Sequence, residues 1–111
     1  MKRGEIWTIR GSGYASKPRP VVIVQANLRS GDSVILCLLT SVDTPEAGYR
    51  LPIKANRKTG LKKNSIVMAE KLLTVRKSDL GERIGSLTDA EMSQLSGLLA
   101  RVLLITPEDL A

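Results

Sequence analysis

Two uninterrupted apolar runs, residues 21–24 and 34–39, constrain the fold of this chain more than any other feature of its sequence. Apolar and polar residues do not alternate in either run, so both faces of each strand should be covered. Only nine residues separate the two runs, too few for the helix that a parallel crossover needs. We therefore expect an antiparallel hairpin that turns near residues 30–32. The entrance of its first strand should lie near the exit of its second.

Further strands are expected at residues 5–10, 49–53 and 65–75, each bounded by glycine, proline or polar residues. The strands precede a single helical pattern near the C-terminus. This order predicts a mainly β (α+β) fold, a small antiparallel β-barrel or curled sheet with a C-terminal α-helix packed on it. At 111 residues the chain is expected to form one domain, spanning residues 1–111.

The helix should begin at Thr88, because Glu91 follows three residues later in the pattern of a capping box. An apolar stripe then repeats at helical spacing and is expected to face the core. Its members are Met92, Leu95, Leu98, Leu99, Val102 and Leu103. Pro107 is expected to end the helical region.

The chain contains no histidine and a single cysteine. This composition excludes serine-histidine and cysteine-histidine nucleophile systems as well as an ordinary structural zinc site, so no metal or cofactor is expected. Cys37 lies within an apolar run and is expected to be a buried small hydrophobe. No apolar run approaches the length of a membrane span, and the N-terminus lacks the apolar stretch of a signal peptide, so a cytoplasmic protein is expected.

Positive charge is concentrated in the first part of the chain. Residues 1–63 hold twelve Lys and Arg against four acidic residues, whereas residues 64–111 hold five against seven. The densest block, residues 50–63, contains Lys54, Arg57 and Lys58 and no acidic residue. Such a block favours an anionic partner, with nucleic acid first, and a solvated loop is the structural alternative.

Arg19 stands between two prolines at the entrance to the first apolar run, two residues after Lys17. Pro18 and Pro20 fix their own φ and hold the residues before them extended. A rigid strand entry with a solvated cation explains this arrangement as simply as a functional arginine does.

Six motifs occur in order along the chain: R-G-E-I-W (3–7), R-P-V-V-I-V (19–24), L-L-T-S (38–41), G-L-K-K-N-S-I-V (60–67), L-T-V-R-K-S-D-L (73–80) and I-G-S-L (84–87). Together they resemble the MazF/PemK toxins, the endoribonuclease (mRNA interferase) halves of bacterial toxin-antitoxin pairs. The resemblance implies an SH3-like barrel, a homodimer and a cognate antitoxin as partner. It also implies metal-independent cleavage of single-stranded RNA at a short specific sequence, which leaves a 2′,3′-cyclic phosphate and a 5′-hydroxyl end.

The family residues tied to catalysis correspond to Arg19 and Thr40. In such a reaction the nucleophile is the 2′-hydroxyl of the RNA, so the protein has to stabilise charge on the phosphate oxygens. A guanidinium suits that task because its planar fork matches two phosphate oxygens, and a threonine hydroxyl can donate to a non-bridging oxygen. Because free guanidinium stays protonated, the general base is left open.

The remaining candidates for RNA contact come from the loop before the first apolar run, the end of the second run and the basic block. They are Tyr14, Lys17, Ser41, Lys54, Arg57 and Lys58. Tyr14 could stack on a base or anchor its own loop.

This chain departs from the family pattern at two places. It has no carboxylate between Glu5 and Asp32, where several relatives carry a glutamate, and it has Leu73 and Arg76 where they have an arginine and an aspartate. The role of the relatives' arginine does not transfer to Leu73. Two other functions remain open, a non-catalytic barrel that binds nucleic acid and a gyrase-poisoning toxin of related fold.

Overall fold

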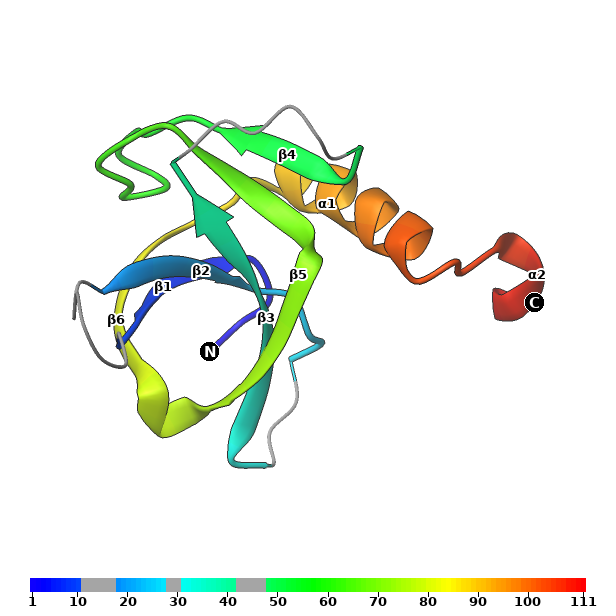
Figure 1. Ribbon diagram of the computed structural model, residues 1–111, viewed down its shortest axis with the longest axis horizontal. Coiled ribbons are helices and arrows are strands. Elements are labelled where there is room, and N and C mark those ends of the chain that lie inside the picture. Colours follow the sequence, from blue (N-terminus) through cyan, green and yellow to red (C-terminus); the bar gives the residue numbers. More distant parts are fainter. Residues whose placement is uncertain (11–17, 28–30, 42–47) are drawn as a thin grey trace.

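The computed structural model describes residues 1–10, 18–27, 31–41 and 48–111 (Figure 1). Within these ranges the strands are β1 (Glu5–Ile9), β2 (Arg19–Ile23), β3 (Ser33–Thr40), β4 (Arg50–Ile53), β5 (Ser65–Arg76) and β6 (Leu80–Ser86). The helical elements are a short 3-10 helix, η1 (Lys77–Asp79), and two α-helices, α1 (Asp89–Val102) and α2 (Pro107–Leu110).

The strands form one sheet in the order β4-β5-β3-β2-β1-β6, and all neighbouring strands are antiparallel. The sheet curls strongly, and α1 lies beside the end formed by β4 and β5 (Figure 1). These features confirm the predicted fold class. Over the described residues, β4 and β6 each pair with one neighbour only, so the curled sheet is not fully closed into a barrel.

The β2 and β3 strands form the antiparallel pair expected from the two apolar runs. Val21 pairs with Leu38 and Ile23 with Leu36. Gly31, at the predicted turn, has a φ of 105°, a left-handed value that glycine adopts without steric cost. Ser30, the first residue of the predicted turn, lies outside the described residues.

Two apolar cores lie on opposite faces of these central strands. The first core contains the buried residues Ile6, Val22, Val24, Cys37, Leu39, Leu51, Ile53, Leu61, Val67, Ala69, Leu87 and Leu95. The second core contains Val21, Ile23, Val34, Leu36 and Leu80. Successive residues of β2 thus enter different cores, which confirms that both faces are covered and explains the lack of polar alternation.

Helix α1 begins as the capping box predicted. The Thr88 hydroxyl accepts a hydrogen bond from the Glu91 amide at 3.1 Å, and Glu91 Oε1 accepts one from the Thr88 amide at 2.8 Å. Leu95 is fully buried in the first core. The placement of Leu103 in the core stripe was wrong, since its exposed fraction is 53%. The helix ends at Val102, and the chain beyond it turns away through Leu104, whose φ is 55°.

Two further elements differ from the sequence prediction. Pro107 does not end the helical region but begins α2, because proline lacks only an amide that the first turn of a helix leaves unused. The strand β6 was missed, since L-G-E-R-I-G-S has neither a long apolar run nor strict alternation. Its strand conformation comes from pairing with β1. No helix in the described part of the chain is long and apolar enough to span a membrane.

Candidate functional site

Arg19 is the first residue of β2, and its side chain is exposed. It pairs with Ile9, the last residue of β1, so its backbone belongs to the sheet rather than to a loop. The flanking prolines restrict this backbone further, as the sequence indicated. A long cationic side chain therefore projects from a well-defined position at one end of the sheet.

Thr40 is the last residue of β3 and is half-buried, and Ser41 follows it with an exposed side chain. Thr40 pairs with Ile66 near the start of β5. The paired stretch of β2 and β3 runs to Val21 and Leu38. Arg19 and Thr40 each lie two residues beyond that pair, at the same end of the hairpin.

Arg19 and Thr40 also share one face of the sheet. Directly opposed residues of antiparallel strands point to the same face, and so do residues two apart on one strand. The pairing of Val21 with Leu38 thus places Arg19 and Thr40 on the face that carries the second core. We call this the Arg19 face. The structure brings the two predicted catalytic residues to the same end and the same face.

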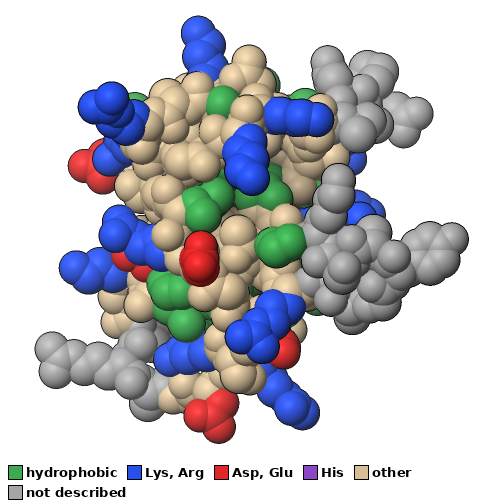
Figure 2. Space-filling view, turned by 90° about the vertical axis from the view of Figure 1, so that its left-hand side faces the viewer, with side chains coloured by type: hydrophobic (Ala, Val, Ile, Leu, Met, Phe, Trp, Pro, Cys, Tyr) green, Lys and Arg blue, Asp and Glu red, His purple; other side chains and the backbone are tan. Residues whose placement is uncertain are grey.

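The basic residues Lys54, Arg57 and Lys58 lie in the loop between β4 and β5, and all three are exposed. Ile53 pairs with Ser65, one residue along from the pairing of Ile66 with Thr40. The loop therefore leaves the sheet at the end where Thr40 lies. Figure 2 shows one face of the molecule, on which projecting Lys and Arg side chains are more frequent than those of Asp and Glu.

Two of the predicted RNA contacts, Tyr14 and Lys17, lie outside the described residues.

One carboxylate inside β5 was missed by sequence reasoning. Glu70 of β5 lies two residues after Met68, which pairs with Arg50, and its Oε1 lies 3.4 Å from Arg50 Nε. Its Oε2 is buried and has no hydrogen-bond partner among the described residues. The signal in the sequence was an acidic residue inside an otherwise apolar strand. Its ion-pair partner on β4 could be found only from the sheet.

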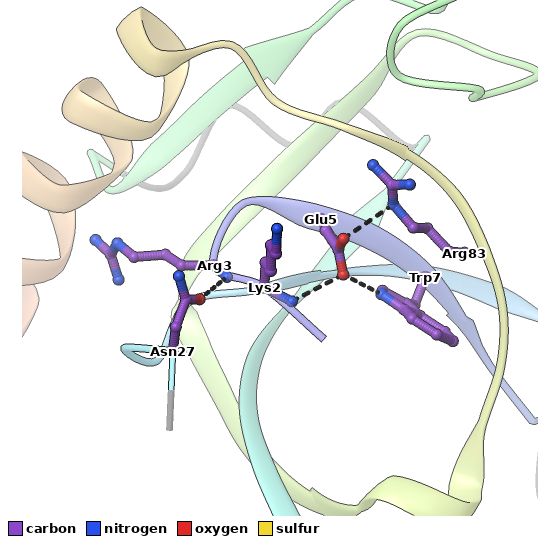
Figure 3. Close-up of polar contacts among 6 residues, drawn as sticks. All are labelled: Lys2, Arg3, Glu5, Trp7, Asn27 and Arg83. Atoms are coloured by element: carbon purple, nitrogen blue, oxygen red, sulfur yellow. Dashed lines mark hydrogen bonds and ion pairs between the residues drawn. The ribbon is translucent and has the colours of Figure 1, made fainter. Parts of the chain in front are cut away.

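Glu5 holds a second ion pair, between β1 and β6 (Figure 3). Its carboxylate accepts hydrogen bonds from the Lys2 amide at 2.8 Å and from Trp7 Nε1 at 3.1 Å, and Arg83 Nε lies 3.1 Å away. Burial raises the pKa of Glu5, but these hydrogen bonds and the charge of Arg83 outweigh it and hold the pKa below its ordinary value. The carboxylate is fully engaged and serves the structure.

Cys37 is completely buried in the first core. Burial, with a smaller effect of the Glu70 charge, raises the pKa of its thiol to about 12. The thiol stays protonated near neutral pH, which confirms that Cys37 is a buried hydrophobe and not a nucleophile.

Comparisons with known proteins agree with this fold. A family model described as a PemK-like, MazF-like toxin of type II toxin-antitoxin system matches residues 2–103. A protein of Mycolicibacterium smegmatis (strain ATCC 700084 / mc(2)155), named probable endoribonuclease MazF, is 37% identical over 94 residues. That alignment covers 83% of this chain and 86% of the relative.

Solved structures share the fold at lower identity. An endoribonuclease from a mycobacterial species, in complex with its cognate antitoxin, has a TM-score of 0.79 and 22% identity, covering 96% of this chain and 97% of that one. The Mycobacterium tuberculosis toxin MazF-mt6 has a TM-score of 0.77 and 21% identity, covering 92% and 98%. MazF in a MazE-MazF structure from Deinococcus radiodurans has a TM-score of 0.78 and 14% identity, covering 96% and 97%.

The family model spans nearly the whole chain, and the sequence relative is similar over most of its own length. The resemblance first indicated by six short motifs is thereby confirmed. The chain belongs to the PemK-like, MazF-like toxins of type II toxin-antitoxin systems.

Proposed function

We propose that this toxin is an endoribonuclease that cleaves single-stranded RNA at the end of the sheet where Arg19 and Thr40 lie. The 2′-hydroxyl of the RNA attacks its own phosphate, the bond to the 5′-oxygen breaks, and a 2′,3′-cyclic phosphate and a 5′-hydroxyl are left. One observation carries this proposal: both residues lie two positions beyond the pair formed by Val21 and Leu38, on the same face. Membership in a toxin family, with a relative named as a probable endoribonuclease, supports it.

The chemistry suits these two side chains. As the 2′-oxygen attacks, negative charge grows on the non-bridging phosphate oxygens, and the guanidinium of Arg19 can bind two of them at once. The hydroxyl of Thr40 can donate a hydrogen bond to the same group. Donors held in place before the reaction stabilise this charge most effectively. The substrate supplies the nucleophile, so the reaction does not require a protein nucleophile or a bound metal.

Cationic and polar side chains around this end of the sheet are proposed to hold the RNA. Lys54, Arg57 and Lys58 would bind phosphates of the RNA beside the cut, together with Ser41 next to Thr40 and with Tyr14 and Lys17 from the segment before β2. Binding through phosphates releases counterions, so the affinity for RNA should fall as salt rises.

The toxin is further proposed to act as a homodimer in the cytoplasm and to be neutralised by a cognate antitoxin. The mycobacterial endoribonuclease of similar fold is described in complex with its cognate antitoxin. A strongly basic toxin, with a net charge of +6, would suit a partner segment that is acidic.

The test is to incubate the purified protein with a long single-stranded RNA in EDTA and to map the new ends. We expect cyclic phosphate ends at a short recurrent sequence. Arg19→Ala and Thr40→Ala should abolish them, whereas Arg101→Ala, which removes an exposed arginine near the end of α1, should not. Continued cleavage by both site variants would contradict the site assignment. RNA binding without new ends would instead favour a non-catalytic binder, and protein-linked DNA breaks with intact RNA would favour a gyrase poison.

A further inference from the structure

The loop between β4 and β5, residues 54–64, concentrates basic side chains, and like charges this close in sequence repel one another. It contains five exposed basic residues and no acidic one: Lys54, Arg57, Lys58, Lys62 and Lys63. We call this segment the basic loop. A solvated surface loop of this composition needs no internal structure. The basic loop nevertheless has extensive internal hydrogen bonding.

Two asparagine side chains bond to the backbone of the basic loop. Asn56 Oδ1 accepts hydrogen bonds from the amides of Lys58 at 3.0 Å and Thr59 at 2.9 Å. Asn64 Oδ1 accepts one from the Ala55 amide at 2.8 Å and so ties the two ends of the loop together. The backbone that carries Arg57 and Lys58 is therefore held in one conformation.

Thr59 fastens the loop from inside. Its exposed fraction is 1%, although Lys58 before it and Gly60 after it are exposed. Polar residues are seldom buried so completely. Its hydroxyl donates to the Lys54 carbonyl at 3.0 Å and accepts from the Asn56 amide at 3.1 Å. A single buried hydroxyl thus links the first residue of the basic loop to its tip.

The basic loop is also docked on β6, far along the chain. The Ser86 amide donates to the Lys58 carbonyl at 3.0 Å. At Gly60, φ is +68° and a Cβ would overlap the Ile84 carbonyl oxygen. At Gly85, a Cβ would overlap the carbonyl oxygens of Lys58 and Thr59. Backbone meets backbone here at a distance that only glycine permits.

We infer that the basic loop is a preorganised phosphate-binding arm, and that Asn56 and Thr59 are positioning residues for RNA bound beside the cut. This inference rests on the proposed function. Holding the backbone that carries the cations in one conformation before the RNA arrives removes part of the conformational entropy that binding would otherwise cost. Asn56 and Thr59 touch only protein and act through the lysines and arginine that they hold.

The test compares three variants for binding to an RNA that contains the mapped cut site, with the attacking 2′-hydroxyl replaced by hydrogen. Thr59→Val removes the hydroxyl and keeps the buried shape, and we expect it to bind roughly five- to tenfold more weakly. Because every charge is retained, the slope of log affinity against log salt should stay unchanged. Thr59→Ser restores the hydroxyl and should restore binding. Lys58→Gln removes a charge and should reduce the slope by about 0.7.

A matched control is Thr8→Val, which also removes a hydroxyl that accepts from a backbone amide, that of Glu82 at 2.9 Å, but outside the basic loop. It should leave RNA affinity unchanged at a temperature where thermal melting shows every variant to be folded. If Thr59→Val does not fold, Asn56→Ala at an exposed position takes its place, with the same expected result.

If Thr59→Val, or Asn56→Ala in its place, binds RNA with wild-type affinity, or if Thr59→Ser fails to restore binding, the positioning role is overturned. The proposal that the protein cleaves RNA would not be affected by either result. A wild-type protein that neither cuts nor binds RNA would overturn the proposed function itself.

Discussion

The two parts of the candidate interface are held in place by different means. Arg19 and Thr40 stand on strands, and their positions follow from the pairing of residues 21–23 with residues 36–38. The basic loop has no strand partners of its own and depends on Asn56, Thr59 and its docking against β6. In the proposed interface, the strand ends would hold the groups that meet the reacting phosphate, and the basic loop would hold the groups that bind the rest of the RNA.

The largest expected effect tests the strand-end part. Arg19→Lys keeps the charge but loses the planar fork that binds two phosphate oxygens. We expect kcat to fall roughly 10²- to 10³-fold, as when one preorganised donor is removed from an active site, while KM changes little. Single-turnover and steady-state cleavage of a labelled RNA would measure both. An unchanged kcat with a raised KM would show instead that Arg19 contributes to RNA binding and not to the chemical step.

Gly85→Ala tests the other part, because its Cβ would overlap the carbonyl oxygens of Lys58 and Thr59 and push the basic loop off β6. We expect a loss of stability of about 1–3 kcal/mol and a higher KM with kcat nearly unchanged. Urea unfolding measures the loss of stability, and cleavage kinetics measure KM and kcat.

Gly97→Ala is the matched control, because Gly97 lies in α1 and a Cβ there meets nothing within 4 Å. It should stabilise the protein by about 0.5–1 kcal/mol. Equal effects of the two substitutions would argue against the docking.

Low pH should destabilise the contact between β1 and β6, the strands next to β2 and to the basic loop, and so affect both parts of the candidate interface. The lowered pKa of Glu5 means that its ionised form stabilises the fold above its ordinary pKa of 4.5, and that this stability is lost as pH falls through the lower value in the folded state. Glu5→Gln should therefore cost about 1 kcal/mol at pH 7, and the difference from wild type should shrink below pH 4.5. Urea unfolding over this pH range would check it. A difference that is constant with pH would mean that ionisation of Glu5 does not stabilise the fold.

The smallest expected effect concerns the stiffness of the strand entrance. Pro20→Ala increases the conformational entropy of the unfolded chain and removes a restraint on the backbone next to Arg19. We therefore expect the free energy of unfolding to fall by about 0.4–1 kcal/mol. We also expect kcat to decrease by no more than about fivefold, because the free energy that corresponds to a fivefold change in rate lies in the same range as this loss of stability. A much larger decrease in kcat at unchanged stability would show that the proline itself orients Arg19.

Much of the fold could be predicted from local patterns. The continuous runs at residues 21–24 and 34–39 predicted a doubly covered antiparallel pair, and Thr88 with Glu91 predicted the start of α1. Both features depend on neighbours in sequence or on burial alone. The strand β6 could not be found in this way, because L-G-E-R-I-G-S becomes a strand only by pairing with β1. Leu103 was misplaced because the apolar spacing continues one residue past Val102, at which the helix ends.

For the candidate site, the sequence by itself determined the kinds of groups present. It supplied an arginine held between prolines, a threonine at a strand end, a block of cations and no histidine, which together limit the chemistry that is possible. Only the tertiary structure decided their arrangement. Whether Arg19 and Thr40 share a face depends on sheet register, and one residue of slip would reverse it.

The order within the basic loop likewise depends on contacts between distant parts of the chain. Gly60 meets Ile84, and Gly85 meets the backbone of Lys58 and Thr59. In the sequence these glycines mark only turns or breaks in a pattern. Their close packing became visible once β6 was placed beside the loop, because backbone contact at such distances is a property of the folded chain alone.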